Sequence, residues 1–322
     1  MEYHDVIIAG GGPAGSSCAR KLRQAQVDCI VLDKAAFPRT KLCAGWITPE
    51  VVSDLDIDVT SYPHRILAFP AMHAYLFGIR IKIPTLQYSI RRYEFDHWLL
   101  ERCGAPSVQH EIKNIRLENG HYVIDDRYAC KYLVGAGGTN CPVFRMFFQG
   151  VNPRSKKALI VCRELEFPYE VRDDRCLLWF FENNLPGYSW FVPKANGYVN
   201  VGIGGFEEKL KRANCSINDH WNFLIAKLKK QNLISDEPLT PKGHSYFLRE
   251  PVKNVQIGNA FLIGDAAGLA TRDMGEGIGP AVRSGMLAAE SIITGKPYSV
   301  DSVGAYSIRH PIFNPLIRWF TK

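Results

Sequence analysis

The first 33 residues limit the fold more than any other part of the chain. Residues 6–9 (VIIA) form a short apolar run, typical of a buried parallel strand, and lead directly into the pattern G-x-G-x-x-G at residues 10–15. Small residues and then Arg20, Lys21 and Arg23 predict a helix from Pro13 to about Gln26. A second apolar run at 29–32 ends at Asp33. This order predicts a β-α-β unit that binds a dinucleotide.

Each residue type in this unit suits one part of a dinucleotide. Gly10 allows the tight turn, Gly12 lets the backbone approach a pyrophosphate, and Gly15 lets the helix pack closely on the strand. The N-terminus of the helix, at Pro13 and Ala14, offers unpaired N–H groups to phosphate. Asp33 is expected to accept hydrogen bonds from a ribose. NAD and FAD both fit this far.

A second segment favours FAD. Residues 260–268 (AFLIGDAAG) read as a buried strand that stops at Gly264 and Asp265, and residues 275–278 (GEGI) open a helix running to about Ile293. A carboxylate at the end of a distant strand can reach the sugar-alcohol chain of FAD, which NAD lacks. Asp265 also suits the N-cap of the helix that follows, a role compatible with cofactor binding.

The combination of these two segments resembles the flavoprotein class of aromatic hydroxylases, flavin halogenases and geranylgeranyl reductases. Three stretches resemble the geranylgeranyl reductases in particular. Residues 188–193 (YSWFVP) resemble the motif YxWxFP, residues 39–45 (RTKLCAG) resemble the loop with a cysteine beside the flavin, and residues 92–96 (RYEFD) resemble the R-x-x-F-D element. The resemblance covers the chain to about residue 298, and longer relatives continue with a helical region, so we expect a substrate wall there to be missing or supplied by a partner.

Two departures leave the reaction open. Val192 replaces the Phe of YxWxFP and brings the motif close to the halogenase pattern GWxWxIP. Gly137 replaces the Asp of the hydroxylase Asp-Gly motif, which weakens the hydroxylase interpretation; residues 135–140 are interpreted as a tight strand exit. The alternatives are a monooxygenase or halogenase acting on an aromatic, and a non-catalytic flavin-binding module or electron carrier.

The resemblance implies an FAD-dependent oxidoreductase that passes a hydride from reduced flavin to a C=C bond of an apolar, isoprenoid-like substrate. Cys43 would then be a proton donor or substrate clamp, and Tyr188 and Trp190, two residues apart on one strand face, would line an apolar channel. The helix that starts near Gly277 would direct N–H groups at the N1/C2 edge of the flavin. The cofactor-binding residues are predicted to be Gly10, Gly12, Pro13, Ala14, Gly15, Asp33, Lys34, Arg39, Cys43, Ala44, Arg92, Gly264, Asp265, Gly275, Gly277 and Ile278.

The fold class is expected to be α/β: a three-layer, Rossmann-like FAD-binding domain with a parallel sheet, and an inserted substrate domain with an antiparallel sheet. Residues 62–87 and 151–244 are rich in aromatics and alternate apolar with polar, which predicts the inserted sheet. The FAD-binding domain would be discontinuous, built from residues 1–61, 88–150 and 245–322. Residues 214–232 are predicted to form a capped amphipathic helix.

Composition excludes several other classes. The apolar content of 46% and charged content of 22% are ordinary for a folded protein, and the net charge of +7 is spread along the chain, so no nucleic-acid partner is predicted. Nine unpaired cysteines and scattered histidines predict reduced thiols, a cytoplasmic location and no metal site.

No apolar run approaches a membrane span of about 20 residues. Residues 306–322 mix large apolar residues with cations and are a candidate for peripheral membrane contact. The electron donor is expected to be NAD(P)H or ferredoxin.

Overall fold

The computed structural model describes residues 1–252 and 254–307 and divides into two compact units. Unit 1 contains Met1–Arg39, Asp96–Arg154 and the described residues from Phe247 on, and unit 2 contains Thr40–Phe95 and Ser155–Tyr246. Residues 40–61 and 88–95 thus belong to unit 2, whereas the predicted boundaries assign them to the FAD-binding domain; the functional division stays a prediction. Most of the predicted membrane-contact segment, 308–322, lies outside the described residues.

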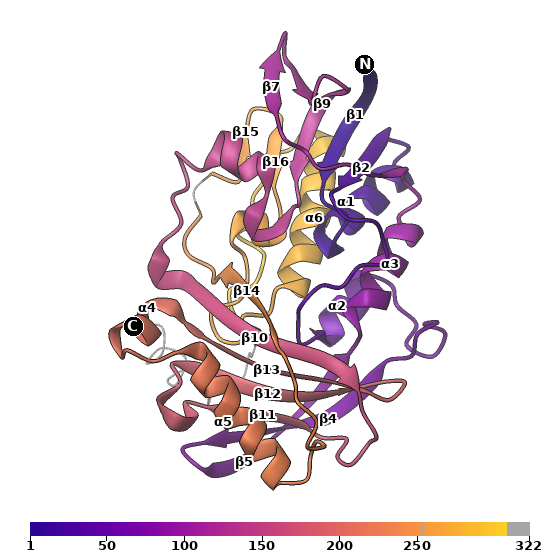
Figure 1. Ribbon diagram of the computed structural model, residues 1–322. Coiled ribbons are helices and arrows are strands. Elements are labelled where there is room, and N and C mark those ends of the chain that lie inside the picture. Colours follow the sequence, from indigo (N-terminus) through magenta and orange to yellow (C-terminus); the bar gives the residue numbers. More distant parts are fainter. Residues whose placement is uncertain (253, 308–322) are drawn as a thin grey trace. The chain divides into compact units, whose positions relative to one another are not determined.

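Unit 1 is built on the predicted β-α-β unit (Figure 1). Its sheet has the order β15-β16-β9-β1-β2-β6, and β1 pairs in parallel with both β2 and β9. A hairpin of β7 and β8 continues from β9 by antiparallel pairing. The strands are β1 (Glu2–Ala9), β2 (Cys29–Asp33), β6 (Ser107–Gln109), β7 (Ile115–Glu118), β8 (His121–Ile124), β9 (Tyr128–Gly135), β15 (Gln256–Ile257) and β16 (Ala260–Leu262).

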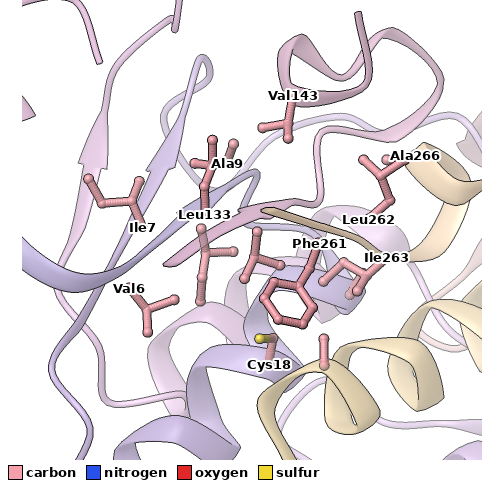
Figure 2. Close-up of a cluster of buried hydrophobic side chains, with 14 of the residues drawn as sticks. Val6, Ile7, Ala9, Cys18, Leu133, Val143, Phe261, Leu262, Ile263 and Ala266 are labelled. Carbon is pink, nitrogen blue, oxygen red and sulfur yellow. The ribbon is translucent and has the colours of Figure 1, made fainter. Parts of the chain in front are cut away.

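The core of unit 1 lies between this sheet and two helices, α1 (Pro13–Gln24) and α6 (Ile278–Thr294). Figure 2 shows Cys18 of α1 close to Phe261 of β16, with Leu133 of β9 among the surrounding apolar side chains. All three are essentially removed from solvent. The continuous apolar runs at 6–9 and 29–32 are therefore explained by burial on both faces of a parallel sheet. The parallel, Rossmann-like region is confirmed.

Unit 2 contains a second sheet, of order β14-β10-β13-β12-β11-β4-β5-β3. Every pair whose register is known is antiparallel except β11 with β4, so the predicted antiparallel sheet is confirmed with one parallel exception. The strands are β3 (Trp46–Ile47), β4 (Leu67–Leu76), β5 (Ile79–Ser89), β10 (Leu159–Pro168), β11 (Cys176–Phe180), β12 (Gly187–Lys194), β13 (Tyr198–Phe206) and β14 (Lys242–Phe247).

One face of this second sheet is covered by α5 (Ile217–Lys230). The apolar side of α5 carries Trp221, Leu224 and Leu228, which share a core with Phe191 and Val201 of the sheet. The hydroxyl of Ser216 caps the helix by accepting the N–H of Asn218. The predicted amphipathic helix is confirmed, and the alternate positions of β10, β12 and β13 are left on the other face.

The remaining helices are short, apart from α3. None of the helices in the described residues is long and apolar enough to cross a bilayer. They are α2 (Pro49–Asp54), α3 (Arg92–Arg102), α4 (Glu207–Arg212), the 3₁₀ turns at Gly138–Asn140, Lys156–Ala158, Glu182–Asn184 and Gly264–Ala267, and a π turn at Phe144–Phe148.

Candidate functional site

The glycine loop between β1 and α1 has the close approaches that its sequence predicts. A Cβ on Gly15 would overlap the carbonyl oxygen of Gly10, and a Cβ on Gly10, whose φ is +122°, would lie 2.5 Å from the carbonyl oxygen of Ala136. Neither position accepts a side chain without backbone movement. The loop is therefore a bare backbone turn at the start of a buried helix, the geometry that accepts a pyrophosphate.

Asp33 helps to hold this loop in place. One oxygen of its carboxylate accepts the N–H of Gly11 at 2.8 Å, and the other accepts the N–H of Ala35 at 2.9 Å. Each oxygen keeps a second lone pair, so the predicted bond to a ribose stays compatible with this arrangement. Lys34, the next residue, is exposed.

Arg39 supplies a positive charge beside the glycine loop. A Cβ on Gly12 would lie 3.3 Å from a guanidinium nitrogen of Arg39, which is also 3.3 Å from the buried carboxylate of Asp96. The guanidinium stacks over Phe37 at 4.6 Å from the ring centroid. A held guanidinium at this place can pair with a phosphate oxygen.

The two sequence segments meet inside unit 1. Gly264, at the end of β16, lies between α1 and α6: its Cβ would be 3.2 Å from the Cβ atoms of both Ala14 and Ala281. The N–H of Gly264 donates to the hydroxyl of Ser284 at 2.9 Å. Asp265 is not an N-cap; Ile263 holds that position and the turn has no side-chain cap. This interpretation was wrong because the strand passes directly into a single 3₁₀ turn.

At the start of α6, the N–H groups of Ile278 and Gly279 are bonded to a carboxylate of the protein. Glu276, the residue before the N-cap Gly277, folds back and accepts the N–H of Gly279 at 2.6 Å. Pro280 has no N–H to offer, and Ala281 donates to Gly277. Burial raises the pKa of Glu276 to about 7, although the N–H groups of Gly279 and Ile278 oppose this shift. The contact of this helix start with the flavin edge stays a prediction.

Arg154, which the sequence reading missed, ties the strand exit after β9 to the second segment. Its guanidinium donates to the carbonyl oxygens of Thr139 at 2.7 Å and Ala266 at 2.8 Å, and lies 3.7 Å from the centroid of Phe144. Desolvation lowers its pKa. No local motif marks an arginine whose partners are backbone carbonyls and an aromatic ring, so the fold is needed to reveal it.

In unit 2, Cys43 begins a short, anchored loop. Its Sγ accepts the N–H of Gly45 at 3.3 Å, and the ammonium of Lys194 donates to the carbonyl oxygen of Ala44. Lys194 is only 2% exposed. Arg92, at the start of α3, is also buried. The predicted residues Cys43, Ala44 and Arg92 thus lie in unit 2.

Tyr188 and Trp190 lie on one face of β12, as their spacing predicts. Their ring centroids are 5.6 Å apart, and the indole N–H of Trp190 donates to the side-chain oxygen of Asn200 at 2.7 Å. The ring of Trp190 covers Gly202, where a Cβ would lie 2.5 Å from Cε2. Trp190 is 5% exposed and rigidly held, whereas Tyr188 is half-buried. Their catalytic role stays a prediction.

The most unusual group on this face is Glu164 of β10, which motif matching did not find. It is fully buried, and neither carboxyl oxygen has a hydrogen-bond partner among the described residues. The sequence feature that could have indicated it is the alternation of Cys162, Glu164 and Glu166 along one strand, together with the glycine-rich strand that pairs with it. Within the described residues, no group of three or more His, Cys, Asp or Glu is placed to hold a metal ion.

Several proteins whose sequences are similar to this chain are named reductases. No family model matches the chain. An uncharacterised protein of Methanosarcina barkeri is 31% identical over 309 residues, covering 91% of this chain and 75% of that protein. The menaquinone reductase of Mycobacterium tuberculosis is 26% identical over 315 residues, covering 89% and 76%. Digeranylgeranylglycerophospholipid reductase 2 of Methanosphaera stadtmanae is 25% identical over 332 residues, covering 94% and 81%.

Solved structures share the fold at lower identity. A geranylgeranyl bacteriochlorophyll reductase-like protein of Thermoplasma acidophilum has a TM-score of 0.77 at 19% identity, covering 99% of this chain and 82% of that one. A flavin-dependent brominase has a TM-score of 0.71 at 18% identity, covering 99% and 83%.

Proposed function

Because the chain belongs to the geranylgeranyl reductase family of flavin-dependent oxidoreductases, we propose that it uses FAD to reduce a C=C bond of an apolar, isoprenoid-like substrate. Bound FAD, once reduced, supplies a hydride. The named reductase relatives also remove the reason to treat the protein as a non-catalytic flavin module.

The observation that carries the choice of cofactor is the meeting of Gly264 with Ala14 and Ala281. It brings the strand end that bears Asp265 to the helix that follows the glycine loop. Asp265 lies beside Gly277, where a Cβ would be 3.2 Å from its Oδ1. One unit thus offers a pyrophosphate turn and, beyond it, a carboxylate suited to the sugar-alcohol chain of FAD.

The residues of unit 1 divide the binding of FAD among them. The bare loop at 10–15 would take the pyrophosphate, Arg39 would neutralise part of its charge, and Asp33 would accept a ribose hydroxyl. Residues 39–45 resemble the family's flavin loop, and on that resemblance we propose a role of Cys43 near the cofactor.

The residues of unit 2 would receive the substrate. Trp190, fixed by Asn200 and packed over Gly202, gives a rigid apolar surface of the kind that lines ligand sites. The names of the relatives point to prenyl chains and prenylated quinones as substrates of those proteins. For this chain we propose a substrate of the same chemical class.

A second candidate is a monooxygenase or halogenase acting on an aromatic. Val192 in the motif at 188–193 and the shared fold of the brominase favour it. Rapid-mixing spectra separate the two reactions. An oxygen adduct of the flavin that decays productively with an aromatic substrate supports this candidate, whereas anaerobic reoxidation by an alkene supports the reductase.

The decisive experiment uses the purified full chain. We expect a yellow protein from which FAD is released on denaturation. After anaerobic reduction with dithionite, geranylgeranyl diphosphate or menaquinone should reoxidise the flavin, with a saturated bond in the product. A protein that neither retains FAD nor recovers it on reconstitution contradicts the proposal.

The electron donor and a membrane contact belong to the same proposal. NAD(P)H and ferredoxin are the donors to compare, by the rate at which each reduces the bound flavin. Contact of residues 306–322 with a membrane is tested by flotation with anionic liposomes, using the full chain and a chain ending at residue 305. Equal flotation of both contradicts that contact.

A further inference from the structure

Glu164 is a buried carboxyl group that the fold does not use. Its side chain is 0% exposed, and both oxygens are without a hydrogen-bond partner in the part of the chain that the structure describes. Leaving a buried polar group unpaired costs free energy, about 1–3 kcal/mol or more. A group that weakens the fold in this way is a candidate for function.

The sheet register places Glu164 next to the motif at 188–193. Glu164 of β10 is opposite Gly202 of β13, which is opposite Trp190 of β12. A Cβ at Gly202 would lie 2.7 Å from the Cβ of Glu164 and 2.5 Å from Cε2 of Trp190. Because position 202 has no side chain, the carboxyl-bearing residue and the indole are neighbours across one strand, on the face that α5 does not cover.

Lys194 and the Cys43 loop belong to the same group of residues. Lys194 shares this face of β12 with Trp190, donates to Ala44, and its Nζ would be 2.7 Å from a Cβ on Gly45. Burial raises the pKa of the Cys162 thiol, two residues before Glu164, and the nearby Glu164 and Cys43 raise it further. We call Glu164, Lys194, Cys43 and Cys162 the Glu164 cluster.

The other acid on this strand is already engaged. Glu166 accepts Nε of Arg91 at 2.8 Å, so it is held as an ion pair. The charged groups that bear on Glu164 are Lys194 from β12, Lys41 from the loop before β3, Arg92 from α3 and Glu166 from β10 itself. Cys43 and Glu164 both act on the thiol of Cys162. His244 of β14, the strand next to β10, lies beside the same Lys41 and Arg92, and burial lowers its pKa to about 4.

Burial shifts the pKa values of Glu164 and Lys194 in opposite directions. Burial raises the pKa of Glu164 to about 8, although Lys194 and Lys41 oppose the shift. Burial likewise lowers the pKa of Lys194 to about 8, although Glu166 opposes the shift. Burial thus favours the form of Glu164 that carries a proton, in a cluster that also contains the amine of Lys194.

We propose that Glu164 gives the proton that completes reduction of the C=C bond, and that Lys194 stabilises the carboxylate left behind; this rests on the proposed function. Saturation of the bond adds one hydride and one proton. The hydride arrives with its electron pair from reduced flavin, which is oxidised, and forms one C–H bond. The O–H bond of Glu164 breaks as the second C–H bond forms, and water then returns a proton to Glu164.

The first test reads the protonation of Glu164 without any turnover. Infrared spectra of the FAD-loaded protein are compared between pH 6 and pH 10 for the wild type, Glu164→Gln and the control Glu208→Gln, whose half-buried carboxylate pairs with Arg212. We expect a protonated carboxyl band in the wild type and control that is lost as pH rises through about 8 and is absent from Glu164→Gln. Identical spectra for the wild type and Glu164→Gln overturn the proposal.

The second test reads the reaction. Each protein is reduced without oxygen and mixed with geranylgeranyl diphosphate or menaquinone. General acids contribute about 10²–10⁴-fold to a rate, so Glu164→Gln should reoxidise at least about 100-fold more slowly while still binding and reducing FAD. Glu164→Asp, which keeps an acid, should recover part of the rate. In the wild type the rate should fall as pH rises through about 8.

The outcomes separate this proposal from the proposed function. If neither compound reoxidises the wild type, the proposed function fails and the infrared result alone decides whether Glu164 is a buried acid. If the wild type and Glu164→Gln are reoxidised equally fast, Glu164 is not the proton donor although the enzyme is a reductase. If Glu164→Gln does not fold, Glu164→Asp carries both tests.

Discussion

The α-carbon of Gly285 on α6 lies directly against the backbone of Ala14 on α1. A Cβ at position 285 would overlap the carbonyl oxygen of Ala14 and would lie 3.2 Å from the amide nitrogen of Cys18. Two helices that are about 270 residues apart in sequence therefore touch backbone to backbone, and they hold Gly264 between them.

This contact predicts a loss of stability on adding one methyl group. Gly285→Ala should lower the free energy of unfolding by about 1–3 kcal/mol, because the backbone of α1 has to move. Gly150, which has no atom within 4 Å of its Cβ position, provides the control Gly150→Ala. Urea unfolding of both variants measures the difference, and equal midpoints contradict the close packing.

Arg39 should contribute to cofactor affinity through its charge beside Gly12. Arg39→Ala should weaken FAD binding about tenfold or more, since a hydrogen bond to a charged group is worth about 1.5–3 kcal/mol. Arg116→Ala removes an arginine on the surface of the same unit and should leave the affinity unchanged. Fluorescence titration of the apoprotein with FAD gives both constants. An unchanged affinity in Arg39→Ala would argue against a phosphate contact.

Glu276 should make stability depend on pH in a specific direction. Its pKa is raised from an ordinary 4.5 to about 7 in the folded protein, so the folded state binds more protons than the unfolded state between these values. Stability from this group is present at low pH and is lost as pH rises from about 4.5 to 7.

Glu276→Gln should therefore gain in melting temperature, relative to the wild type, as the pH goes from 5 to 8. The control Glu208→Gln, on the surface of α4, should follow the wild type across the same range. Thermal melts of the three proteins at several pH values measure these differences in melting temperature. A constant difference between Glu276→Gln and the wild type would mean that Glu276 is ionised throughout.

Cys43 should act on substrate binding if Glu164 is the acid. Cys43→Ser is expected to raise KM about tenfold and to change kcat much less, whereas a loss of kcat with KM unchanged would make Cys43 itself the proton donor. The exposed Cys215 gives the matched control Cys215→Ser. Steady-state kinetics with reduced FAD and a prenyl substrate measure both parameters.

Sequence alone predicted those parts whose signal is local. The β-α-β unit, the capped amphipathic helix within residues 214–232, and the strand position shared by Tyr188 and Trp190 follow from periodicity, glycines and caps within a few residues of each other. These patterns depend on the chain's own geometry, so the structure agrees with them.

Groups whose environment comes from distant strands were not predictable. Glu164 is buried because Gly202 and Trp190 lie beside it, and Arg154 binds the carbonyl oxygens of residues 139 and 266. At the N-terminus of α6, the bond from the N–H of Gly279 to Glu276 was likewise not foreseen. In each case the role of the residue depends on a hydrogen bond that is made or missing in the fold, and the sequence around the residue does not show this.

The parallel pairing of β11 with β4 has a consequence for how the chain is made. Cys176 lies opposite Met72 and Leu178 opposite Ala74. The two strands are about a hundred residues apart in sequence, and residues 96–154 between them belong to unit 1. During synthesis the first stretch leaves the ribosome with the partner of β4 still untranslated. An apolar strand edge is exposed for that interval, so we expect slow assembly and a need for chaperones.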